Sequence, residues 1–245
     1  MNLQEFSREF DILYDNVTSG KAPGFNEYEK SVFLTKAQDQ LLKNYFNPLG
    51  NKYQAGYSQN TKRTVDFSNI IRSTVIEGTV AIESTYRNTM VYDVPKDILF
   101  PTGLVLRNSS GKELQVVHVS EVELTRLFRK PYKQPYKGEA YKIDNMTEDR
   151  QYEIIVGKVG IEGGYSLYLR YVKIPKPIIL MDLEELEKNM GLPEDFLSIN
   201  GVRKESECEL HDSIHYEILD RAVNLAKVHY ETTPEAIIQY STNNE

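Results

Sequence analysis

The spacing of apolar residues near the start of the chain predicts a helical hairpin. Five apolar residues three or four positions apart define one face of a first helix: Leu3, Phe6, Phe10, Leu13 and Val17. Gly20 and the pair Pro23–Gly24 end this helix. Asn26 and Glu29 have the spacing of a capping box, in which each side chain accepts the other residue's backbone N–H. A second helix is therefore expected from this box to about Phe46.

From Phe67 onward the apolar pattern changes to short β-rich segments separated by Gly, Pro, Asn and Ser. The expected strands are Ser73–Val80, Met90–Val94, Leu104–Arg107, Leu114–His118, Ala140–Ile143, Tyr152–Val159 and Tyr165–Val172. In the last one, Leu167, Leu169 and Tyr171 alternate with polar positions, as expected for a strand with one buried face. The last two segments, joined by 160–164, are expected to pair as a hairpin.

Two further helices are predicted, a short one over Val119–Arg129 and a C-terminal one over about Leu210–Tyr230. The predicted fold class is therefore α+β, with an N-terminal helical hairpin, an antiparallel β-rich core and a C-terminal helix. The expected regions are 1–66 (helical hairpin and long loop), 67–180 (antiparallel β core with a short helix and a basic loop) and 181–245 (acidic helical region).

The composition is that of an ordinary globular protein, with 40% hydrophobic and 27% charged residues among 245. The N-terminus is acidic and amphipathic, unlike a secretory signal, and no run approaches the ~18 apolar residues of a membrane-spanning helix. We therefore expect a protein made in a cytosol, with no membrane partner. Cys208 is the single cysteine, so a disulfide would have to join two chains.

Charge is distributed unevenly along the chain, although the net charge is only -7. Residues 124–142 contain six bases and one acid, a balance of +5, whereas residues 181–220 contain twelve acids and three bases, a balance of -9. Opposed patches of this kind bear on association with partners rather than on fold.

Four stretches, in order along the chain, resemble one family of phage proteins. They are 23–38 (PGFNEYEKSVFLTKAQ), 127–135 (LFRKPYKQP), 171–180 (YVKIPKPIIL) and 209–226 (ELHDSIHYEILDRAVNLA). Together they are similar to the head-to-tail connector ring, or adaptor, proteins of crAss-like and related Bacteroidetes tailed phages. In that family the third stretch is the strand that closes the β core, and the fourth is the C-terminal helix.

The resemblance implies a structural virion protein that forms a ring in the portal-to-tail connector and provides a conduit for the genome. The implied partners are further copies in a twelve-fold ring, the portal protein, adjacent ring or tail proteins, and genomic DNA that passes through the lumen without tight binding. No catalytic residue, cofactor or metal is implied. The expected location is the connector or tail region of the virion, and the host cytoplasm during assembly.

A cyclic ring places one patch of a subunit against a different patch of its neighbour. The basic tract and the acidic segment are candidates for these two patches. The expected interface residues are Arg126, Arg129, Lys130, Tyr132, Lys133, Tyr136 and Lys137. Two unrelated, solvated surfaces would produce the same sequence pattern.

A nucleic-acid-binding module is the alternative function. Arg and Lys alternate with Tyr132, Tyr136 and Tyr141 in residues 126–142, a composition that stacks on bases and pairs with phosphates. The acidic net charge argues against a protein built to hold nucleic acid over its whole surface.

Catalytic motifs are weak. His211 and His215 have the spacing of two zinc ligands on a helix, with Cys208 or His229 as possible additional ligands, but Asp212 replaces the glutamate of the zinc hydrolase motif. The glycines of 157–164 lie between predicted strands, which favours a turn over a phosphate loop. We interpret His118 as a sheet residue.

Overall fold

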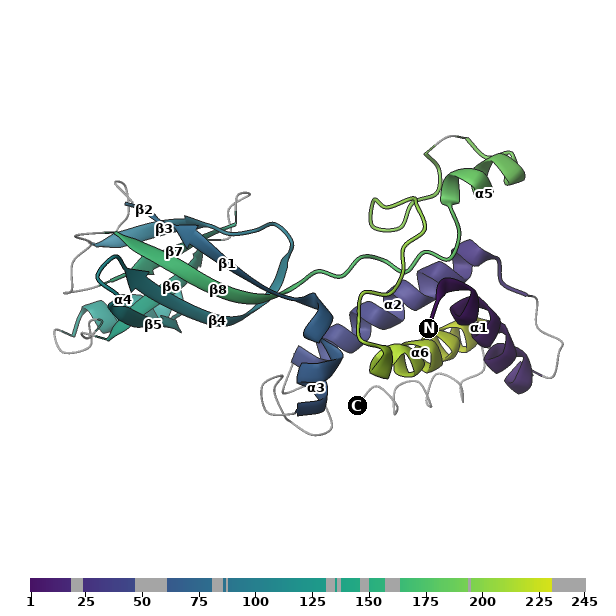
Figure 1. Cartoon of the computed structure of the whole chain (residues 1–245), viewed down its shortest axis with the longest axis horizontal. Helices are drawn as coiled ribbons and strands as arrows, with labels where there is room; N and C mark the ends of the chain where they lie inside the picture. The colour runs from purple at the N-terminus through teal and green to yellow at the C-terminus, as the bar shows by residue number, and fades with distance from the viewer. Residues whose placement is uncertain are drawn as a thin grey trace. The chain divides into compact units, whose positions relative to one another are not determined.

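The computed structural model describes residues 1–18, 24–46, 61–80, 86, 88–130, 135, 138–145, 150–156, 164–193 and 195–230. The chain divides into two compact units, each with its own core (Figure 1). The helical unit contains residues 1–70 and 175–245, and the barrel unit contains residues 71–174. The predicted α+β fold, with N-terminal helices, a β-rich core and a C-terminal helix, is confirmed. The sequence boundaries after residues 66 and 180 stay a prediction.

The helical unit joins both ends of the chain around three longer helices. Its elements are α1 (Leu3–Thr18), α2 (Glu27–Phe46), α3 (Thr61–Asp66), η2 (Ser68–Ile70), α5 (Leu183–Met190), η4 (Asp212–Ile214) and α6 (His215–Tyr230). Helices α1 and α2 pack on α6. The predicted capping box is confirmed at the start of α2, where Asn26 Oδ1 accepts the Glu29 N–H at 2.8 Å and Glu29 accepts the Asn26 N–H at 3.0 Å.

An extended segment, residues 175–180, returns from the barrel unit and runs along α2. Three polar side chains on one face of α2, at Ser31, Thr35 and Gln38, bond to its backbone. Ser31 Oγ accepts the N–H of residue 180 at 3.0 Å, Thr35 Oγ1 accepts that of residue 178 at 3.1 Å, and Gln38 Nε2 donates to the carbonyl of residue 176 at 2.9 Å. All three side chains are buried. The stretch 171–180 is thus divided, because only its first residues belong to the sheet.

The described residues of the barrel unit form one sheet of eight strands. The strands are β1 (Ile71–Glu77), β2 (Thr79–Val80), β3 (Thr89–Asp93), β4 (Ile98–Asn108), β5 (Glu113–His118), β6 (Glu139–Asn145), β7 (Gln151–Ile155) and β8 (Tyr165–Lys173). Their order is β1-β8-β4-β5-β6-β7-β3-β2. All pairings are antiparallel except that of β5 with β6, which α4 (Glu121–Phe128) connects. The core is therefore mixed rather than purely antiparallel, because a connection through a helix allows neighbouring strands to run parallel.

The predicted hairpin of the last two strands is wrong. β7 pairs with β3 and β6, whereas β8 pairs with β1 and β4. The alternation in β8 is confirmed, since Leu167, Leu169 and Tyr171 are buried and Tyr168 and Arg170 are exposed. Alternation specifies the buried face of a strand but not its neighbours, which explains why a correct pattern led to a wrong pairing.

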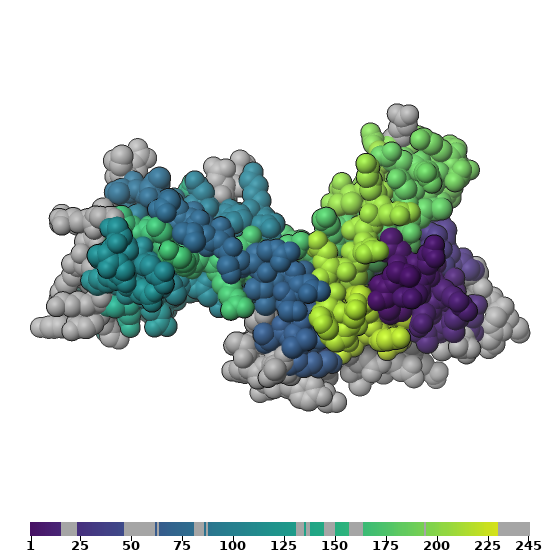
Figure 2. All heavy atoms as spheres, viewed as in Figure 1, coloured from purple at the N-terminus to yellow at the C-terminus, as the bar shows by residue number. Residues whose placement is uncertain are grey.

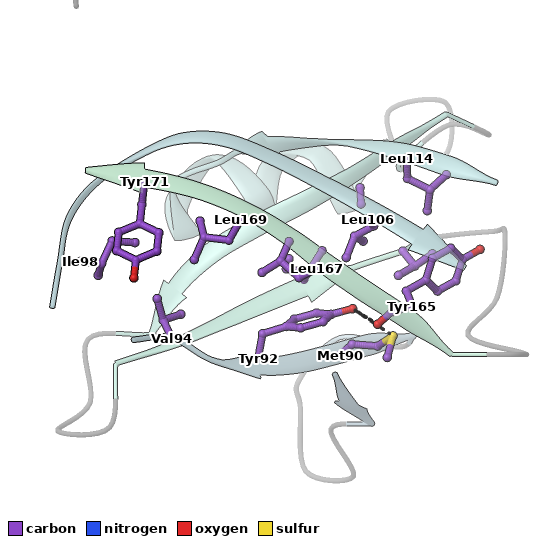
Figure 3. Close-up of a cluster of buried hydrophobic side chains, with 13 residues drawn as sticks. Met90, Tyr92, Val94, Ile98, Leu106, Leu114, Tyr165, Leu167, Leu169 and Tyr171 are labelled. Carbon is purple, nitrogen blue, oxygen red and sulfur yellow. Dashed lines mark hydrogen bonds between the residues drawn. The ribbon is translucent and has the colours of Figure 1, made fainter. Parts of the chain in front are cut away.

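The sheet curls so that its two end strands meet. Gly78 alone separates β1 from β2, yet these strands lie at opposite ends of the strand order. A flat sheet of this size would place them about 34 Å apart, so the sheet must close into a barrel-like form at this end. The interior is filled by the buried side chains in Figure 3, from β3, β4, β5 and β8 among others.

Tyr92 packs against the closure and ties it to β8. Its side chain is fully buried, and its hydroxyl donates to the Tyr165 carbonyl at 2.9 Å (Figure 3). A Cβ added at Gly78 would lie 2.6 Å from two ring atoms of Tyr92 and 2.9 Å from Met90 Cε. Only glycine therefore fits where the ring meets the backbone.

Cys208 lies half-buried in the helical unit, with its Sγ 3.6 Å from Gln38 Oε1. Burial raises the pKa of this thiol to about 11. Since the thiolate is the reactive form, the environment of Cys208 disfavours the chain-to-chain disulfide that the sequence left open.

We expect Gly78→Ala to destabilise the barrel unit by about 1–3 kcal/mol, because the added methyl group overpacks the buried Tyr92 ring. Equilibrium denaturation monitored by tyrosine fluorescence and circular dichroism measures the change. Gly103→Ala is the matched control, since its Cβ would meet Arg170 Cβ at an ordinary 3.7 Å. Equal stability of the two variants would contradict the closure at Gly78.

We expect native Cys208 to react with a disulfide reagent at neutral pH about a hundredfold more slowly than in guanidinium, because its pKa is raised. Reagent absorbance in native and unfolded samples gives both rates. Similar rates in the two states would show that the thiol is not protected by the fold.

Candidate subunit interface

Helix α4 carries the first part of the predicted interface and is anchored on the outer face of the barrel. Ser120 caps its start by accepting the Glu123 N–H at 3.3 Å. Leu124 is fully buried in a cluster with Val119 and Ile155, and further side chains of α4 and β6 pack against it. This packing fixes the orientation of the helix and leaves its opposite face in solvent.

The opposite face of α4 is a stripe of one apolar and two cationic residues. Val122, Arg126 and Arg129 are four and three positions apart, the spacing of one helix face. Val122 is 73% exposed, and both arginines are exposed. Within the part of the chain that the structure describes, neither arginine has an ion-pair partner. We call these three residues the α4 stripe.

Three of the seven predicted interface residues are therefore located together. Arg126, Arg129 and the exposed Lys130 lie at the C-terminal end of α4. The other four, Tyr132, Lys133, Tyr136 and Lys137, lie outside the described residues. The tract as a contact surface, whether for protein or nucleic acid, stays a prediction.

Lys142, one of the six bases of the tract, does not belong to the exposed surface. Its side chain is 3% exposed, its Nζ lies 2.7 Å from Asp144 Oδ1, and it stands 3.8 Å above the Tyr152 ring. Burial and the Asp144 charge raise the pKa of Tyr152 to about 12. Lys142 is thus buried and paired with Asp144, so the exposed positive charge of the tract is lower by one.

The acidic segment is partly neutralised by Arg203. Both oxygens of the buried Glu187 are bonded, one to the Leu197 N–H at 2.5 Å and the other to Arg203 at 2.5 Å. Arg203 also pairs with Asp195 and lies 3.7 Å from Glu184. The segment is therefore not one uncompensated patch, because several carboxylates hold the fold together.

Glu217, at the start of α6, is a further acidic residue with a structural role. It accepts hydrogen bonds from Lys62 and from the Tyr45 hydroxyl, each at 2.5 Å. Burial alone would raise the pKa of Glu217, but these bonds more than offset it, so the pKa lies below its usual value.

His211 and His215, weighed as zinc ligands, have separate structural partners. His211 precedes η4 and its Nδ1 accepts the Ser213 N–H at 3.2 Å, so it is not on the same helix as His215. His215 is buried with its Nε2 3.2 Å from the Leu210 carbonyl, and burial lowers its pKa. Among the described residues, no three His, Cys, Asp or Glu side chains are grouped to hold a metal.

His118 lies in β5, as the sequence predicted, with its Nδ1 3.5 Å from Asp144. Within the described ranges, no helix is both long and apolar enough to cross a membrane.

Sequence reasoning missed one exposed aromatic residue. Phe196, in the acidic segment, is 65% exposed. A count of charges gives no weight to an apolar residue, and a single phenylalanine carries no periodic signal that would distinguish it from a core position.

Comparison with known proteins assigns the chain to a family. The family model described as phage tail ring protein 3/4 matches residues 1–236. Ring protein 4/5 of Bacteroides phage crAss001 is 41% identical over 250 residues, covering 100% of both chains. Ring protein 3 of the same phage is 31% identical over 237 residues, covering 92% of this chain and 95% of the relative. The chain therefore belongs to the phage tail ring protein 3/4 family.

Proposed function

We propose that this protein is a non-enzymatic structural subunit of the virion that forms a ring in the portal-to-tail connector and surrounds the path of the genome. The observation that carries the proposal is similarity to two ring proteins of one phage, over 100% and 92% of this chain. The proposed partners are further copies in a twelve-fold ring, the portal protein, and adjacent ring or tail proteins. DNA passes through the lumen without being held.

The chemistry of the described residues supports a structural role. Three buried charged side chains, Lys30, Lys142 and Glu187, form ion pairs within their own unit, and a fourth, Asp66, accepts a hydrogen bond from the Ser213 hydroxyl. Removing one partner of such a pair is costly, because it leaves an uncompensated buried charge. These charged groups therefore have a structural role inside each unit.

We further propose that the basic tract forms part of the contact between neighbouring subunits. The proposed residues are Arg126, Arg129, Lys130, Tyr132, Lys133, Tyr136 and Lys137. Three observations support this: the first three are cationic, are exposed in the structure, and lie in or directly after the last turn of α4, whose orientation is fixed by packing. The facing surface would be acidic, since a ring contact joins two different patches.

Reversing Lys130, Lys133 and Lys137 to Glu should stop ring assembly, because like charges would then face each other across the contact. Light scattering after size exclusion, together with negative-stain microscopy, measures ring content. The matched control reverses the exposed Lys96, Lys112 and Lys204, which changes the net charge equally. Loss of rings in both triple variants, or in neither, would argue against a specific role of the tract.

Quantitative mass spectrometry of gradient-purified virions should find this chain and the portal protein in near-equal copies, as a portal-matched ring requires. Host proteins removed during purification serve as the background control. Absence of the chain from virions would overturn the proposed function.

A further inference from the structure

An arm formed by residues 181–206 belongs to the helical unit and presents Phe196 to solvent. In Figure 2 this arm, in green, stands out from the helices α1, α2 and α6 of its unit. Its base is held on α2, since Ile179, Leu183, Leu197 and Ile199 form a buried cluster against which Tyr28 and Val32 pack. The arm thus has a core of its own, and Phe196 is excluded from it.

The exposure of Phe196 is fixed by bonds on both sides. On one side, Asp195 adopts a positive φ of 62° and is held by an ion pair with Arg203. On the other, Leu197 is buried and its N–H bonds to the buried Glu187. A residue with a side chain at positive φ is unfavourable unless its surroundings impose it. The ion pair of Asp195 and the backbone bond of Leu197 therefore position the chain on both sides of the exposed ring.

The surroundings of the ring are negative. Asp195 and Glu184 are 82% and 45% exposed, and within the described residues three carboxylates, those of Asp195, Glu184 and Glu187, lie around one guanidinium, that of Arg203. A rigid aromatic side chain with a polar rim is the arrangement of an interface anchor, which gains most when it enters a desolvated contact. The surface that covers it must therefore offer apolar area and positive charge together.

The α4 stripe offers this combination. Val122 provides exposed apolar area in the first turn, beside Glu121 and Glu123, and Arg126 and Arg129 follow it one and two turns later on the same helix face. A guanidinium stacks favourably on an aromatic ring and pairs with a carboxylate at the same time. The arm and the stripe are different patches of one chain, as contacts around a closed ring require.

We propose that Phe196 of one copy docks on the α4 stripe of the next copy in the ring. This inference rests on the proposed function, because it takes the second copy as the occupant. The acidic surface that faces the basic tract is then the arm around Phe196 and not the whole segment 181–220.

Cysteine cross-linking between two separately labelled chains tests this contact. Phe196→Cys and Val122→Cys are placed in different chains, both carrying Cys208→Ala so that no other thiol is present. After mixing and mild oxidation, the yield of mixed dimer should be at least tenfold higher than the yield from Phe196→Cys mixed with Val75→Cys. Val75 is the matched control because it is 53% exposed in the same unit as Val122. Circular dichroism confirms that each variant is folded.

Three outcomes separate this inference from the proposed function. Rings together with the specific cross-link support both. Rings without the cross-link, or with equal linking to Val75→Cys, overturn the docking of Phe196 on the α4 stripe and indicate that another tail protein covers it, leaving the ring function in place. If both rings and cross-links are absent, the copy-to-copy contact is overturned. The copy number of the chain in virions then tests the proposed function separately.

Discussion

The pairing of an extended segment with a helix face determines how the helical unit is built. Residues 175–180 lie beside α2 and, except for the exposed Lys176, are buried. Buried backbone groups need partners other than water, and Ser31, Thr35 and Gln38 supply bonds to the segment. Two residues of extended chain advance about 6.6 Å and four residues of helix about 6 Å, so the bonds from Ser31 and Thr35 stay in step. On its other edge, Ile179 exchanges two backbone bonds with Ser206. The extended segment is therefore bonded on one edge by helix side chains, where a strand in a sheet would have a second strand.

This arrangement separates the chain into two units with distinct interiors. The barrel unit is an insertion between residues 70 and 175, closed on itself at Gly78 and filled by its own core. The helical unit is assembled from both ends of the chain, and the arm branches from it directly after the segment on α2. Each unit thus presents its outer surface on a rigid framework, the α4 stripe on one and Phe196 on the other. A ring subunit needs such surfaces because its contacts repeat at every copy.

The sequence predicted the helices and strands better than it predicted which strands pair and which side chains meet. The capping box at Asn26, the alternation in β8 and the helix after Val119 are local signals, and all three were found. The β7–β8 hairpin was wrong because pairing depends on closure of the whole barrel. Ser31, Thr35 and Gln38 were not expected in the interior, since a polar side chain reveals its burial only when its partner is known.

At the candidate site, the charges counted in the sequence likewise do not show which charged side chains are exposed. A sequence count treats every carboxylate of 181–220 and every base of 124–142 alike, yet Glu187 and Lys142 are buried and paired while Arg126 and Arg129 are exposed. Exposed pairs contribute little to association, and buried ones are already committed to the fold. What remains to attract a neighbour is an apolar anchor with charge around it. Phe196 and Val122 meet that description, and neither contributes to a charge count. The side chains that each unit leaves exposed against the hydrophobic effect are therefore the ones that gain most from burial in a contact.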